Sequence, residues 1–227
     1  MADTSPSRRI LLVAEKHPQY NDGKWIEYDS NAKLISAFNA AKAENFKGWG
    51  RLNAETLAVL NSMELQPRDN HREHNEQTGR FSDSMTPIIQ DVMTAIKKNT
   101  PFSGIIAKKI MPASQRVTNA EFTSVPTPRW GESQPFHEHH DAINSVEGGL
   151  ELAKIANDIQ IPVVIHSQKT EPSYFSMNSL NPALKHLLHR KPAKTTFYND
   201  DDAKGIFVGL AKEIIASEKK QAATMSR

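Results

Sequence analysis

The sequence contains no cysteine, so a disulfide framework and a thiolate metal site are both excluded. It also has no long apolar run near its start. The first such run, residues 10–14, is too short for a signal peptide or a membrane span. Neither sign of charge is in clear excess, because the chain has 28 Lys and Arg residues and 26 Asp and Glu residues. No block of like charge is long enough to indicate nucleic-acid binding. These absences predict a soluble, cytoplasmic chain with neither a nucleic-acid nor a membrane partner.

The 227 residues suffice for one large domain. We expect a flexible N-terminus over residues 1–9, a single domain over 10–217 and a tail over 218–227. Two polar segments, at about 66–82 and 113–145, interrupt the regular patterning. Long structureless segments inside a compact domain are often functional.

Apolar patterning predicts strands and helices that alternate along the chain. A continuous apolar run, typical of a strand buried on both faces, occupies residues 10–14, and residues 161–165 form a second apolar strand. Further strands are predicted at 105–110 and 195–198. Residues 54–65 suit a strand or a short helix, and we favour a strand. Helical stripes occupy residues 31–44, 84–99, 146–156, 182–189 and 202–217. This alternation predicts an α/β fold: a doubly wound parallel sheet with helices on both faces.

Four segments, in order, resemble parts of response-regulator receiver domains. "RRILLVAEKHP" resembles their first strand, and "GIIAKKIMP" their third strand with its Met-Pro turn. "VEGGLELAKIANDIQIPVVIHS" resembles the third helix and fourth strand, and "KTTFYNDDDAKGIFVGLAKEI" the fifth strand and helix. The resemblance covers most of the chain outside the two polar segments. It implies a five-stranded, flavodoxin-like sheet of order 2-1-3-4-5 with two long loop insertions.

The family's chemistry does not carry over with this resemblance. Lys108 stands where receivers have the phospho-acceptor aspartate, and Ala14-Glu15 leaves at most one carboxylate of the acidic pair that binds Mg²⁺. Asn199 falls near the family's lysine, and only the hydroxyl at Ser167 matches. The resemblance thus implies a degenerate pocket.

An ammonium beside one carboxylate cannot hold Mg²⁺, which requires several oxygen ligands in a near-octahedral shell. An amine also cannot form an acyl phosphate. Two interpretations of Lys108 carry equal weight. It forms a fixed ion pair with Glu15 across adjacent strand ends, or it leaves the sheet edge for solvent together with Lys109.

A histidine cluster lies in the second insertion, and imidazoles with carboxylates are good Zn²⁺ ligands. The candidate ligands are His137, His139, His140 and Asp141, with His71 and His74 in the first insertion as further candidates. Segments that follow strands meet at the carboxyl edge of a doubly wound sheet, here together with His166. The alternatives are solvated or helix-capping histidines, and an anion or peptide site that uses Lys108, Arg129 and backbone N–H groups.

These features favour a receiver-like module that cannot be phosphorylated. It would bind another protein, such as the signalling proteins that the resemblance implies, through the face of the fourth helix, fifth strand and fifth helix. We expect no enzymatic activity and no cofactor, with Mg²⁺ disfavoured and Zn²⁺ the one candidate metal. Two alternatives stay open: a metal-dependent hydrolase, and a small-molecule or nucleotide sensor whose insertions cover the carboxyl edge. Neither the partner nor the oligomeric state follows from the sequence.

Overall fold

The structure is a computed structural model. It describes the backbone of residues 7–21, 24–70, 73–75, 80–82, 85–108, 148–167 and 196–225. Within these ranges, some side chains, including those of residues 15–28, lie outside the description. The insertion predicted at 113–145 and the short helix predicted at 182–189 fall outside the described residues.

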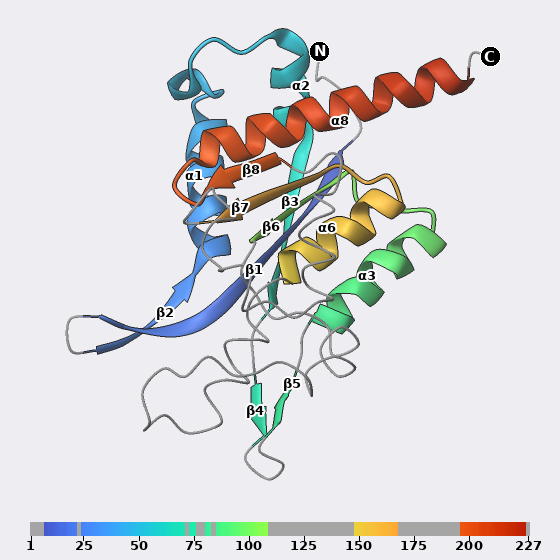
Figure 1. Ribbon diagram of the computed structural model, residues 1–227. Coiled ribbons are helices and arrows are strands. Elements are labelled where there is room, and N and C mark those ends of the chain that lie inside the picture. Colours follow the sequence, from blue (N-terminus) through green and yellow to red (C-terminus); the bar gives the residue numbers. More distant parts are fainter. Residues whose placement is uncertain are drawn as a thin grey trace, which may run out of the picture.

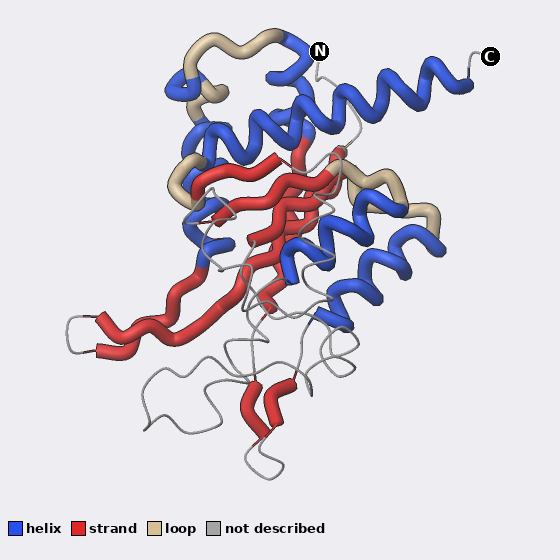
Figure 2. The backbone as a smooth tube through the Cα atoms, in the orientation of Figure 1, coloured by secondary structure: helices blue, strands red, loops and turns tan. Residues whose placement is uncertain are grey.

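A parallel sheet forms the centre of the molecule (Figures 1 and 2). Its strand order is β3-β1-β6-β7-β8, and every neighbouring pair in this order is parallel. The strands are β1 (Arg8–Asn21), β3 (Met63–Asn70), β6 (Gly104–Lys108), β7 (Val163–Ser167) and β8 (Thr196–Asn199). The predicted doubly wound, flavodoxin-like order is therefore confirmed.

Helices cover both faces of this sheet, because successive strand residues point to opposite sides. Ile10 and Leu12 pack with α1 (Ser30–Ala43), α2 (Ala54–Ser62) and α8 (Ala203–Met225). Leu11 and Val13 pack on the other side with α3 (Met85–Lys97) and α6 (Gly148–Asp158). Figure 1 shows α3 and α6 together on one side of the sheet and α8 across the other. A strand segment with both faces buried is apolar throughout, as residues 10–14 of β1 are.

Strand β1 is longer than the predicted 10–14. It continues beyond the parallel sheet as an antiparallel ribbon with β2 (Lys24–Asp29), from Lys16↔Asp29 to Asn21↔Lys24. This ribbon leaves the body of the sheet at its carboxyl edge (Figure 1). Helix α1 begins at Ser30, directly after β2. Asp29 caps this helix, because its Oδ1 accepts from the backbone N–H of Ala32 at 2.9 Å.

The strand favoured at 54–65 is wrong. Residues Ala54–Ser62 form α2, and the second strand of the sheet, β3, begins only at Met63. Asn53 caps this helix by accepting from the backbone N–H of Thr56 at 2.7 Å. Thr56, Val59 and Leu60 are buried at helical spacing, and this burial outweighs the strand preference of the β-branched residues.

The first predicted loop, 66–82, is also more ordered than expected. Strand β3 reaches Asn70, and β4 (Glu73–Asn75) pairs antiparallel with β5 (Arg80–Ser82). The polar residues of β3 are accommodated because this strand is the edge of the parallel sheet on its side. An edge strand does not have to be apolar on both faces.

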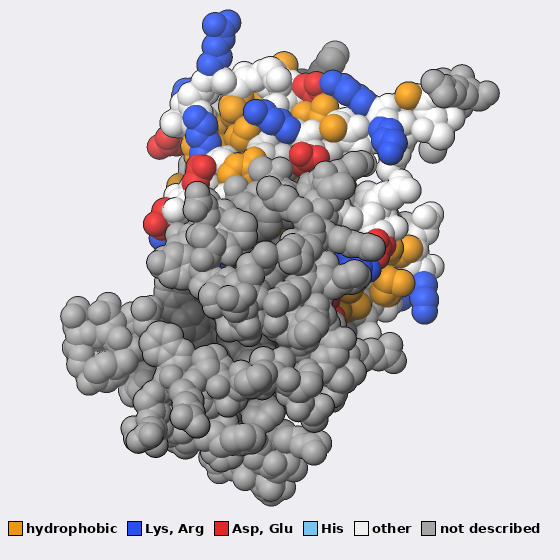
Figure 3. Space-filling model, in the orientation of Figure 1, with side chains coloured by type: hydrophobic (Ala, Val, Ile, Leu, Met, Phe, Trp, Pro, Cys, Tyr) orange, Lys and Arg blue, Asp and Glu red, His pale blue; other side chains and the backbone are white. Residues whose placement is uncertain are grey.

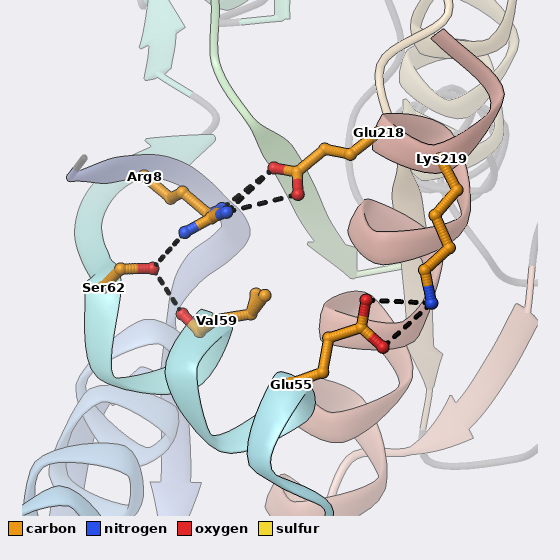
Figure 4. A network of polar contacts seen from close by, with 6 residues as sticks. All are labelled: Arg8, Glu55, Val59, Ser62, Glu218 and Lys219. Carbon is orange, nitrogen blue, oxygen red and sulfur yellow. Dashed lines mark hydrogen bonds and ion pairs between the residues drawn. The ribbon is translucent and has the colours of Figure 1, made fainter. Parts of the chain in front are cut away.

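Helix α8 continues to Met225, past the predicted end at 217 and through most of the expected tail. Side chains on its extension are tied to the rest of the domain (Figure 4). Glu218 accepts from Arg8, which also donates to Ser62 Oγ at 2.8 Å, and Lys219 pairs with Glu55 of α2. These contacts anchor the last turns of a helix that otherwise extends beyond the sheet.

Candidate functional site

Polar side chains gather where the strands end, on the face covered by α1 and α8. Lys108 is the last residue of β6, and it pairs in register with His166 near the end of β7. Neighbours in register on parallel strands point to the same face. Ile106 and Val164, two positions earlier on the same strands, belong to the core beneath α1 and α8. Since residues two apart on a strand point to the same face, Lys108 and His166 face that helix layer too.

Lys108 is buried, with only 7% of its surface exposed. Its ammonium donates to Ser30 Oγ at 3.2 Å and so joins the end of β6 to the first residue of α1. The interpretation that Lys108 leaves the sheet for solvent is therefore wrong, because the first turn of α1 covers it. Lys109 and the side chain of Glu15 lie outside the described residues, so the proposed pair between Glu15 and Lys108 stays a prediction.

His166 and Asp200 form a buried pair beside Lys108. The distance between His166 Nδ1 and Asp200 Oδ1 is 2.7 Å, within the range of charge-assisted hydrogen bonds. The two residues are 1% and 8% exposed. Neither His166 Nε2 nor Asp200 Oδ2 has a hydrogen-bond partner in the part of the chain that the structure describes. Because a buried polar atom without a partner is destabilising, this pair needs a further partner.

A second buried polar residue, Asn31, fixes the start of α1 to the end of β3. Its amide donates to the backbone carbonyl of Arg68 at 3.2 Å and to Asp69 Oδ1 at 3.3 Å. Asn31 is 2% exposed. Contacts from Ser30 and Asn31 thus hold the N-terminal end of α1 over the ends of two strands, on either side of β1.

The other predicted pocket residues contribute less to this cluster. Ser167 ends β7, but its side chain lies outside the described residues. Asn199 ends β8 and is exposed, and its Oδ1 accepts from the backbone N–H of Asp201 at 2.9 Å. The Asn199 side chain therefore stabilises the turn into α8.

The predicted metal ligands cannot be placed. His137, His139, His140, Asp141 and His71 lie outside the described residues, as does the side chain of His74. Within the described ranges, no group of three or more His, Cys, Asp or Glu side chains could hold a metal ion. The zinc site in the insertions remains a prediction.

The partners of Lys108 and His166 were missed by sequence reasoning. Ser30 was not among the candidate site residues, and Asp200 lies inside the acidic run Asp200-Asp201-Asp202. The available signal for Asp200 was a carboxylate that directly follows β8, next to a strand with a histidine one residue before its end. It does not distinguish Asp200 from Asp202, whose Oδ1 instead accepts from the backbone N–H of Gly205 at 2.7 Å in the first turn of α8.

Strand β8 lies close to α8 because two glycines on the helix leave room for Tyr198. A Cβ at Gly209 would overlap the phenol oxygen, and one at Gly205 would come within 2.8 Å of the ring carbon Cδ1. Burial raises the pKa of the Tyr198 hydroxyl, and the carboxylates of Glu213 and Asp202 raise it further.

The described surface carries charges of both signs. On the face shown in Figure 3, Lys and Arg side chains over α8 alternate with Asp and Glu side chains. Among the described helices, none has the length and apolar character needed to cross a membrane.

Known proteins give no family for this chain. No protein-family model matches it, and no curated protein or solved structure is significantly similar. Strand order and the polar cluster at the carboxyl edge are thus the observations that bear on function.

Proposed function

We propose that this chain is a receiver-like signalling module that takes no phosphoryl group and acts in the cytoplasm by binding another protein. The observation that carries the proposal is the buried Lys108 at the end of β6, the position of the phospho-acceptor in the family that the sequence resembles. The hydrogen bond to Ser30 holds the Lys108 ammonium at this position. An ammonium here repels Mg²⁺ and cannot form an acyl phosphate.

The absence of phosphoryl transfer is tested with a small-molecule phosphodonor. The protein is incubated with acetyl phosphate and Mg²⁺, and its intact mass is measured after denaturation, beside a receiver domain that carries the usual aspartate. We expect the mass of a phosphoryl group on the control receiver and none on this chain. A stoichiometric phosphoryl adduct on this chain would refute the proposal.

Docking is expected on the face of β8 and α8. Strand β8 ends the sheet order, and Lys212 is an exposed position on α8 beside it. The competing face is α3, where the large apolar side chains Met93 and Ile96 are 40% and 37% exposed. Exposed apolar groups of this size are found at interaction sites.

Photo-crosslinking from two positions decides between these faces. A photoreactive amino acid replaces Lys212 on α8 in one variant and Lys97, exposed on α3, in the other. Both variants are expressed in the cells from which the protein comes. We expect one protein to be enriched from position 212 and not from 97. Capture from 97 alone would move the docking surface to α3, and capture from neither would overturn the interaction.

A further inference from the structure

We propose that the carboxyl edge between β6 and β7 binds a small oxyanion of the phosphate class noncovalently, with Lys108 and His166 as its donors. This inference rests on the proposed function, since it puts a free ligand where the resembled family carries a covalent phosphoryl group. Four properties of the edge support it: its place in the topology, the shared face of the two donors, the unpartnered imidazole nitrogen and the adjacent helix start.

The topology places Lys108 at the point where the strand order reverses. From β1 the chain passes first to β3 on one side and then to β6 on the other. In doubly wound sheets, ligands bind in the crevice that this reversal opens at the carboxyl ends of the strands. Lys108 is the last residue of β6, and so lies directly at this crevice.

Two potential cations lie next to each other on one face at this point. Lys108 and His166 are paired in register on adjacent strands, whose backbones lie about 4.8 Å apart in sheets. Both are buried on the side covered by α1 and α8. An anion that contacts the ammonium from this side is therefore within reach of the imidazole.

The imidazole of His166 is oriented for such a contact. Asp200 Oδ1, 2.7 Å from Nδ1, fixes the orientation of the ring and leaves Nε2 as the ring nitrogen available to a ligand. The structure describes no partner for Nε2, although the side chain is 1% exposed. An oxyanion of the phosphate class would supply the missing hydrogen-bond partner of Nε2.

The start of α1 adds a third source of positive potential. Helix α1 has 14 residues and no acidic residue in its first turn, and Ser30 at its start contacts Lys108. Backbone N–H groups and the helix dipole favour an anion at such an end. The capping carboxylate of Asp29 accepts from Ala32 and opposes this effect. We therefore expect a dissociation constant of about 1 mM rather than nanomolar affinity.

Inorganic phosphate is the probe. Thermal unfolding of the full chain is followed as phosphate is added, against sodium chloride at the same ionic strength, and the affinity is confirmed by calorimetry. We expect phosphate to raise the unfolding midpoint, as a ligand of the native state does. His166→Gln and Lys108→Gln should each weaken binding about tenfold or more, the loss of one charged hydrogen bond. Lys154→Gln, an exposed lysine on the opposite face, is the matched control and should bind as the parent does.

Glycerol phosphate is titrated in parallel. Tighter binding of glycerol phosphate than of inorganic phosphate would indicate an organic phosphate ligand, and the reverse would indicate the free ion. No stabilisation beyond that of chloride by either compound overturns the inference. Equal stabilisation of all three variants also overturns it, because phosphate would then act on the surface in general.

A second measurement keeps the test valid if a buried variant fails to fold. Ring-nitrogen NMR signals of His166 in the unmodified chain, assigned through contacts with the neighbouring Tyr198, should shift as phosphate is added and saturate with the same affinity. An unchanged His166 signal in the presence of bound phosphate contradicts the assignment of the site. The phosphodonor experiment is independent of both readouts, since a covalent adduct survives denaturation and a bound ion does not. Failure of phosphate binding would thus leave the proposed function standing.

Discussion

His166 Nδ1 lies 2.7 Å from Oδ1 of Asp200, and this contact joins the end of β7 to the turn before α8. The residues are 34 positions apart in the sequence. Both side chains are buried and largely removed from water. Their hydrogen bond to each other therefore offsets part of the cost of desolvation.

Replacing Asp200 with Ala should lower the free energy of unfolding by about 1–3 kcal/mol, because it leaves the Nδ1 of a buried imidazole without its partner. Asp201→Ala is the matched control: its side chain is 79% exposed in a surface pair with Lys33, so its loss should cost less than about 1 kcal/mol. Urea unfolding measures both. A cycle with His166→Ala should give a coupling of about 0.5–3 kcal/mol. Equal effects of the two aspartate variants would show that the pair contributes nothing.

Gly209→Ala should destabilise the protein by about 1–3 kcal/mol, because the new methyl group overlaps the phenol of Tyr198. In a Tyr198→Val background the same change should instead stabilise by about 0.5–1 kcal/mol, the helix preference of Ala over Gly. Gly48→Ala serves as the control, since a Cβ there meets nothing within 4 Å. The free energy of unfolding from urea titrations decides. A Gly209→Ala variant as stable as the parent chain would contradict this account of the packing.

Stability should fall as the pH rises above about 10, the ordinary pKa of tyrosine, and keep falling through the raised pKa of folded Tyr198. The sign follows because the folded state holds the phenolic proton more tightly than the unfolded chain. The contribution is thus complete below the unfolded pKa and lost above it. Tyr198→Phe should reduce this slope while leaving the titration of other groups in place. Parallel pH slopes for the two proteins would mean that Tyr198 is not the group responsible.

Ending the chain after Ser217 should lower the free energy of unfolding by about 0.5–2 kcal/mol, since it removes both Glu218 and Lys219 and their pairs with Arg8 and Glu55. Ending it after Gln221 keeps both pairs and should change stability by less than about 0.5 kcal/mol. Most of the difference should disappear at about 1 M salt, where the screening length is about 3 Å. Urea unfolding at low and high salt provides the comparison. Indistinguishable truncations would show that the pairs do not anchor α8.

Elements with strong local signals were predictable. The apolar runs of β1, β6 and β7 are buried on both faces, and their order along the chain gave the doubly wound sheet. Helices α1 and α3 were placed within two residues of the predicted ends, because a cap or an amphipathic stripe marks each one. Where the local signal was mixed, at 54–65, the balance between helix and strand depended on burial against α8 and β1.

The candidate site was only half predictable. Lys108 ends β6 and His166 is the last residue but one of β7. Because parallel topology brings strand ends to one edge, the sequence predicts that these two residues lie near each other. Their partners do not follow from the sequence in this way. Ser30 is 78 positions from Lys108 in the sequence. The two residues meet because the ribbon of β1 and β2 places the start of α1 at this edge.

By itself, the sequence determined what each segment is able to bury and which chemistry the end of β6 cannot perform. Apolar periodicity is a local property, and the lysine at position 108, whose amine cannot form an acyl phosphate, is a fact of composition at one position. Only the tertiary structure decided that this lysine is buried against α1, that His166 is held by Asp200, and that α8 extends past residue 217. These outcomes depend on contacts between distant residues, as between Arg8 and Glu218, 210 positions apart. Such contacts form only when the whole chain has packed, so no local pattern encodes them.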